Sequence, residues 1–109
     1  MASDEDFVRF LAEQMNDAGV IRFRKMFGEY AIYCNEKVIA LVCDNKLFVK
    51  PTDGGRAYIG NVVEEPAYPG ANPFFFIEDH FENSEWLREL IRITEKELPA
   101  PKPKKAKKG

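Results

Sequence analysis

The sequence predicts an α+β fold of two layers, in which an antiparallel sheet is packed by an N-terminal and a C-terminal helix. Three observations lead to this prediction. Apolar residues recur at helical spacing near both ends of residues 1–98. Between those segments the apolar period changes to two, over four short runs between residues 20 and 50. The turns between these runs are too short for crossover connections, so the strands form an antiparallel meander.

The first helix is predicted over about residues 4–17. Its apolar residues at helical spacing are Phe7, Phe10, Leu11 and Met15. Ser3 is placed to cap its first turn, and Gly19 to end it, because glycine accepts the backbone conformation that follows a helix.

Four strands follow in the predicted meander. The first ends near Phe27, and the others cover residues 29–34, 37–43 and 46–50. The turns are Asn35-Glu36 and Asp44-Asn45. Asn35-Glu36 lacks the glycine that a type I′ turn prefers, so an extra loop residue is an open alternative.

The register of the second and third strands predicts a sheet that is apolar on both faces. Pairing Cys34 with Lys37 places Ile39 beside Ile32 and Leu41 beside Tyr30 on one face. The other face then holds Ala31, Tyr33, Val38, Ala40 and Val42. A sheet with one wet face would alternate apolar and polar residues instead. We therefore expect a further helix layer, a partner subunit or a ligand on the second face, and a homodimer satisfies this expectation.

The rest of the domain adds two helices and one or two strands. A short helix is predicted from Thr52 to Ile59, and Tyr68-Pro69-Gly70 has the type II turn pattern. Phe74 to Ile77 form a strongly apolar strand. Asn83 or Ser84 caps the last helix, which Pro99 ends.

Charge divides the chain into an acidic domain, residues 1–98, and a disordered Lys/Pro-rich tail, residues 99–109. Removing the five tail lysines from the sixteen basic residues leaves eleven against eighteen acids, so the domain carries about −7. The tail lysines are Lys102, Lys104, Lys105, Lys107 and Lys108. With Arg22 and Arg24 they are candidate contacts for weak, salt-sensitive nucleic-acid binding. A solvated tail that only aids solubility is the alternative.

The sequence offers no catalytic constellation, metal site or cofactor motif, so the expected protein is not an enzyme. His80 lies in an acidic segment without a neighbouring nucleophile, and Gly54-Gly55 lacks the Lys-Ser/Thr of a phosphate-binding loop. Cys34 and Cys43 are expected as separate, buried, reduced thiols. No apolar run is long enough to span a membrane, and the N-terminus is acidic, so a cytoplasmic protein is expected.

Arg24, Met26, Phe27, Gly28 and Tyr33 form a signature that resembles the N-terminal domain of the TfoX/Sxy competence regulators. The resemblance implies a secretion-chaperone-like α+β fold, typically dimeric, and a non-enzymatic protein-interaction module. Regulators of this family promote natural competence together with a transcription-regulatory partner, the cyclic-AMP receptor protein. They carry a second, helical domain, where this chain has a lysine-rich tail. By this resemblance Met26 and Phe27 are expected in the core.

Overall fold

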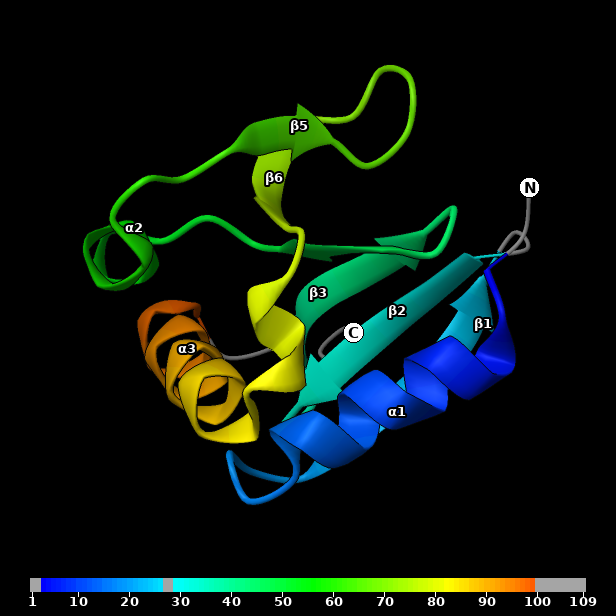
Figure 1. Ribbon diagram of the computed structural model, residues 1–109, viewed down its shortest axis with the longest axis horizontal. Helices are drawn as coiled ribbons and strands as arrows, with labels where there is room; N and C mark the ends of the chain where they lie inside the picture. The colour runs from blue at the N-terminus through cyan, green and yellow to red at the C-terminus, as the bar shows by residue number, and fades with distance from the viewer. Residues whose placement is uncertain (1–2, 27–28, 100–109) are drawn as a thin grey trace, which may run out of the picture.

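The computed structural model describes residues 3–26 and 29–99, and these form one helical layer on one six-stranded sheet (Figure 1). The helical elements are α1 (Glu5–Met15), α2 (Asp53–Ile59), a 3-10 turn η1 (His80–Glu82) and α3 (Ser84–Glu97). The strands are β1 (Ile21–Met26), β2 (Glu29–Cys34), β3 (Lys37–Cys43), β4 (Lys46–Val49), β5 (Glu64–Pro66) and β6 (Pro73–Ile77). The predicted α+β class and the meander are confirmed, and of the predicted one or two later strands the structure has two, β5 and β6.

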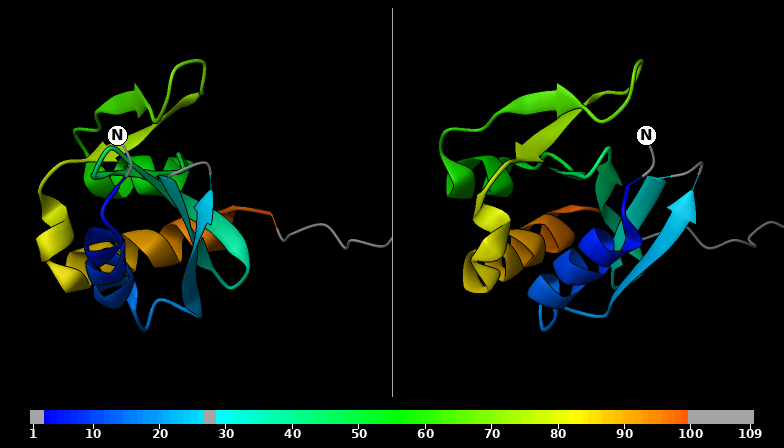
Figure 2. Two further views of the ribbon diagram at one scale, coloured as in Figure 1. Left: turned by 90° about the vertical axis from the view of Figure 1, so that its right-hand side faces the viewer. Right: turned by 45° about the vertical axis from the view of Figure 1, so that its right-hand side comes forward.

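All strand pairs are antiparallel, in the order β1-β2-β3-β4-β6-β5. The helical elements contact one another: α3 packs against α1, α2 and η1, and η1 also contacts α1. They therefore belong to a single layer. The views in Figure 2 show α1 and α3 together on one side of the β1–β3 strands.

The core lies between this helical layer and the sheet. Leu11 of α1 and Leu87 and Leu90 of α3 are fully buried in one cluster with Ile32 of β2 and Val49 of β4. Burying each such side chain contributes about 1.5–3 kcal/mol to folding. Among residues 3–26 and 29–99, no helix is both long and apolar enough to cross a membrane.

The ends of α1 differ from those predicted. Asp4 occupies the N-cap position and its side chain makes no capping bond. The Ser3 hydroxyl instead donates to Glu29 Oε1 at 2.7 Å, so Ser3 ties the chain start to β2 rather than capping the helix. The helix ends at Met15, four residues before Gly19, and Asp17 takes the positive φ of 83°. Gly19 serves close packing, because an added Cβ would lie 2.7 Å from Cys34 Sγ.

The register between β2 and β3 changes at a β-bulge. Tyr33 pairs with Val38 as predicted, but Ile32 pairs with Ala40 rather than with Ile39. The predicted pairing of Leu41 with Tyr30 is therefore wrong, and Leu41 pairs with Ala31. The extra residue places both Ile39 and Ala40 in the core, a rearrangement that strict alternation could not predict.

Two-residue turns join the strands of the meander. Asn35 and Glu36 have φ values of 52° and 70°, and Asp44 and Asn45 have 55° and 58°. These are the positive φ values of a type I′ turn, which Asn and Asp tolerate better than most residues. The Asn35-Glu36 turn therefore has no extra loop residue, although it also has no glycine.

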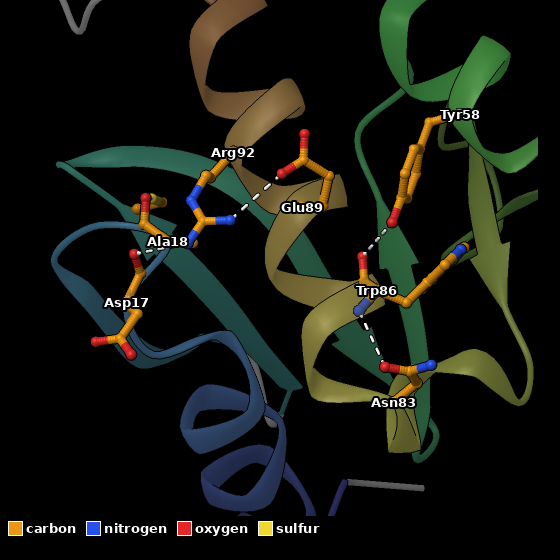
Figure 3. Close-up of polar contacts among 8 residues, drawn as sticks. Asp17, Ala18, Tyr58, Asn83, Trp86, Glu89 and Arg92 are labelled. Carbon is orange, nitrogen blue, oxygen red and sulfur yellow. Dashed lines mark hydrogen bonds and ion pairs between the residues drawn. The ribbon is translucent and has the colours of Figure 1, made fainter.

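Both ends of α3 are fixed by side chains. Asn83 Oδ1 accepts a hydrogen bond from Trp86 N at 3.1 Å, which confirms the predicted cap (Figure 3). At the other end, Lys37 Nζ donates to the carbonyl oxygens of Glu95 and Leu98, at 2.7 and 2.9 Å. The end of α3 therefore lies beside the β2–β3 turn.

Candidate docking face

The sheet face opposite the helical layer is apolar and, within the described residues, carries no helix. By the observed register, its side chains come from alternate positions of neighbouring strands. We call it the open face; its residues are Arg22, Arg24, Met26, Glu29, Ala31, Tyr33, Val38, Leu41, Cys43, Lys46, Phe48, Glu65, Phe74 and Phe76. The prediction that both sheet faces are apolar is confirmed, although the bulge exchanges some of their members.

The open face is only partly shielded from water. Phe48 is 3% exposed and stacks on Phe76, with ring centroids 5.5 Å apart. Tyr33, Leu41 and Phe76 are half-buried. None of the open-face residues belongs to the core cluster under the helices. A contiguous patch of this kind is typical of a surface that binds another molecule.

The signature residues that the structure describes gather on the open face. Arg24 pairs with Ala31, and Tyr33 pairs with Val38, so both side chains are on this side of the sheet. Met26 is also on it and is 38% exposed. The expectation that Met26 belongs to the core is wrong, because β1 is an edge strand and no described helix covers it. Phe27 and Gly28 lie outside the described residues.

The two candidate nucleic-acid arginines share the open face but differ in their partners. Arg22 forms an ion pair with Glu36 at 2.6 Å and lies over the Tyr33 ring, 5.0 Å from its centroid. The hydrogen bond and charge of Glu36 raise the pKa of Arg22, and the same bond lowers the pKa of Glu36. Arg22 is thus already paired with an acid, which weakens it as a phosphate contact. Lys25 points to the other face, since it pairs with Tyr30. The five tail lysines lie outside the described residues.

A groove of about 650 Å³ adjoins the open face. The loop after β5 forms one wall, and the adjoining ends of β1, β2 and β3 form the other. We call it the loop groove; its residues are Met26, Glu29, Tyr30, Leu41, Cys43, Asp44, Ala67, Tyr68 and Pro69. Among the described residues that line it, the charged ones are the acids Glu29 and Asp44. Its volume is within the range of small-ligand pockets.

The loop groove is anchored by backbone and side-chain contacts. Glu29 Oε1 accepts hydrogen bonds from Ser3 N at 3.1 Å and from Asp44 N at 3.2 Å. On the opposite wall, Ala71 N donates to the Tyr68 carbonyl at 3.0 Å, and Gly70 has a φ of 88°. This confirms the predicted type II turn and leaves the Tyr68 side chain 56% exposed beside the groove.

The two cysteines are buried and free, as predicted. Burial raises the pKa of Cys34, and burial with the charges of Glu29 and Asp44 raises the pKa of Cys43 to about 11. A thiol with so high a pKa is protonated at neutral pH, whereas a cysteine nucleophile acts as the thiolate. The Cys43 thiol, which lines the loop groove, therefore behaves as an apolar group.

The remaining sequence candidates have structural roles. The His80 ring stacks on Trp86 with centroids 4.7 Å apart. Gly54 lets α2 approach α3 closely, because an added Cβ would meet Ile93 Cγ2 at 2.8 Å. Within residues 3–26 and 29–99, no three His, Cys, Asp or Glu side chains are grouped to hold a metal ion.

The fold and this face define an α+β domain with helices on one side of an open antiparallel sheet. The family model of the TfoX N-terminal domain matches residues 13–98, and the chain belongs to this family. It is also 41% identical over 107 residues to a Spirochaeta aurantia protein described as an uncharacterized 12.7 kDa protein in the trpE 5′ region. That alignment covers 98% of this chain and 93% of its relative.

The loop groove is the part of the site that the sequence did not predict. Tyr68-Pro69-Gly70 indicated a turn, but no local pattern showed that this turn would lie opposite Met26 and Asp44. The acidic residues Glu29 and Asp44 looked like ordinary residues at strand ends.

Proposed function

We propose that this chain is a non-enzymatic protein-interaction module that works as a homodimer through its open face. The observation that carries the proposal is the gathering of Arg24, Met26 and Tyr33 on an apolar sheet face that no described helix covers. A second sheet packed on it would bury Leu41 and Phe76, and a half-buried aromatic ring gains about 1–2 kcal/mol when its remaining surface leaves water.

Charge complementarity supports a second copy as the occupant. Arg24 stands on β1, one edge of the sheet, while Glu65 of β5 pairs with Phe74 at the other edge, on the same face. A two-fold axis between the faces and parallel to the strands would place each β1 over the partner's β5. Arg24 of each protomer would then approach the acid of the other, as a self-complementary interface requires.

Sedimentation equilibrium of the full chain tests this proposal. The wild-type chain should show a reversible dimer, and Phe76→Lys should weaken dimerisation by about tenfold or more, because a charge would be buried in the apolar interface. Phe10→Lys is the matched control: Phe10 is 40% exposed but lies on α1, away from the open face. A wild-type chain that stays monomeric, or equal weakening by both variants, would contradict the dimer.

The proposed biological role follows from the family. As a TfoX N-terminal domain, the chain would take part in transcription regulation in the cytoplasm, as competence regulators do. Its dimer would bind a regulatory protein. Co-purification of a transcription factor with the wild-type chain, lost in Phe76→Lys and kept in Phe10→Lys, is the expected result. If the transcription factor co-purifies with both variants, the open face is not required for its binding.

A further inference from the structure

We propose that the loop groove binds the chain's own C-terminal segment, residues 99–109. This inference goes beyond the proposed dimer and does not require it, although the loop groove shares residues such as Met26 and Leu41 with the open face. It rests on the charge and shape of the groove, the composition of the segment, and the point at which α3 ends.

The loop groove suits a cationic, extended segment. Glu29 and Asp44 give its lining two negative charges, and among residues 3–26 and 29–99 no basic residue lines it. Tyr68 and Met26 present apolar surface beside these acids, at 56% and 38% exposure. Aromatic-lined grooves are typical receptors for proline-rich segments, and acidic lining residues favour a segment that carries lysines.

Residues 99–109 have that composition. Prolines at positions 99, 101 and 103 favour the polyproline II conformation, which reaches a groove with little loss of conformational entropy. Five lysines follow or alternate with them, and no acid does. The segment therefore carries about +5 against about −7 on the domain.

The segment is long enough to reach the groove on its own molecule. Lys37 Nζ bonds the Leu98 carbonyl at 2.9 Å, so the segment starts beside the first residue of β3. The groove lies at the other end of β3, beside Cys43, about 20 Å away at about 3.3 Å per residue. Eleven residues at about 3.1 Å each span about 34 Å.

Amide chemical shifts of the ¹⁵N-labelled full chain test the proposal. The comparison is with a full-length variant in which all five tail lysines are glutamine. We expect the shift differences to centre on the loop groove, at Met26, Asp44 and Tyr68, and to vanish in high salt, which screens the charges. Differences confined to residues near Leu98, or none, would overturn the proposal.

Carbodiimide cross-linking of lysine to carboxylate provides a second, independent measurement. Cross-links between the tail lysines and Asp44 are expected in the wild-type chain, and Asp44→Asn should lose them. Asp17→Asn is the matched control, because both aspartates have positive φ values in turns but Asp17 lies at the far end of α1. Tail cross-links distributed evenly over the surface carboxylates would contradict a specific site.

The same samples distinguish groove binding by the tail from nucleic-acid binding by the tail. If the groove shifts are absent while duplex DNA binds the wild-type chain and not the glutamine variant, the tail serves DNA and the proposal fails. If groove shifts are present and sedimentation shows a monomer, the tail site stands although the proposed dimer does not.

Discussion

Phe48 and Phe76 stack with their ring centroids 5.5 Å apart, and this contact joins the meander to the later hairpin across the open face. Phe48 belongs to β4 and Phe76 to β6, which neighbour each other in the sheet although the segment between them contains α2 and β5. The apolar surface thus continues from β2 across β4 to β6. One side of the sheet packs against the core, and no helix of the described residues covers the other.

Loss of the α3 cap should destabilise the domain. Asn83→Ala removes the acceptor for Trp86 N, and we expect the free energy of unfolding to fall by about 1 kcal/mol. Urea denaturation measures this. Ser84→Ala is the control, since α3 begins at Ser84 and no side-chain cap bond comes from it. Equal losses in the two variants would show that the cap contributes nothing of its own.

Lys37 should be worth more to stability than an ordinary surface lysine. Its ammonium donates to two carbonyls and lies 3.1 Å from the Glu95 carboxylate, with the lysine side chain only 15% exposed. Lys37→Met leaves these acceptors unpaired, so a loss of about 1.5–3 kcal/mol is expected in urea denaturation. Lys46→Met, on an exposed lysine of β4, should change stability by less than about 0.5 kcal/mol. If Lys46→Met lowers the free energy of unfolding as much as Lys37→Met does, the buried contacts of Lys37 do not account for its effect.

The Cys43 thiol should make stability depend on pH in the alkaline range. Its pKa is raised from 9.0 to about 11, so the native state holds this proton more tightly than the unfolded chain. The contribution is complete below pH 9 and is lost as the pH rises toward about 11. Cys43→Ala should therefore lose less stability over this range, as measured by urea midpoints. The lysines and tyrosines are the same in the wild-type chain and the variant, so their effects cancel in the comparison. If the stability of both proteins falls equally with pH, the pKa shift assigned to Cys43 is wrong.

The contact of Ser3 with the β2 start and the β3–β4 turn should stabilise the N-terminal segment. The Ser3 hydroxyl donates to Glu29 Oε1 and accepts from Asn45 N at 3.0 Å. Ser3→Ala should lower the free energy of unfolding by about 1 kcal/mol and speed hydrogen exchange at the Asn45 amide. Unchanged exchange at Asn45 would show that the contact is not formed in solution.

Local sequence patterns predicted most of the fold. Period-two runs bounded by Asn35-Glu36 and Asp44-Asn45 predicted the meander, and Asn83 predicted the start of α3. The bulge at Ile39 escaped prediction because no local residue type demands it; it is favoured by the burial of both Ile39 and Ala40 under the helices. Ser3 was misassigned for a similar reason, since Glu29 lies 26 residues away.

The candidate site was predicted in its chemistry but not in its shape. The apolar second face was predicted because residues 29–43 are apolar at alternate positions on both sides of the hairpin. The loop groove depends on where Tyr68 and Pro69 lie relative to Met26 and Asp44, a long-range arrangement set by strand order. The family resemblance led us to expect Met26 in the core, yet its edge-strand position leaves it partly exposed.

Isotope-filtered NOE spectroscopy tests the open-face dimer most directly. A sample mixed from labelled and unlabelled full-length chains reports only contacts between protomers. For the open-face dimer we expect intermolecular NOEs from the Leu41 and Val38 methyl groups to aromatic rings such as Phe76. Concentrated samples without intermolecular NOEs, or with NOEs only from α1 and α3, would contradict it.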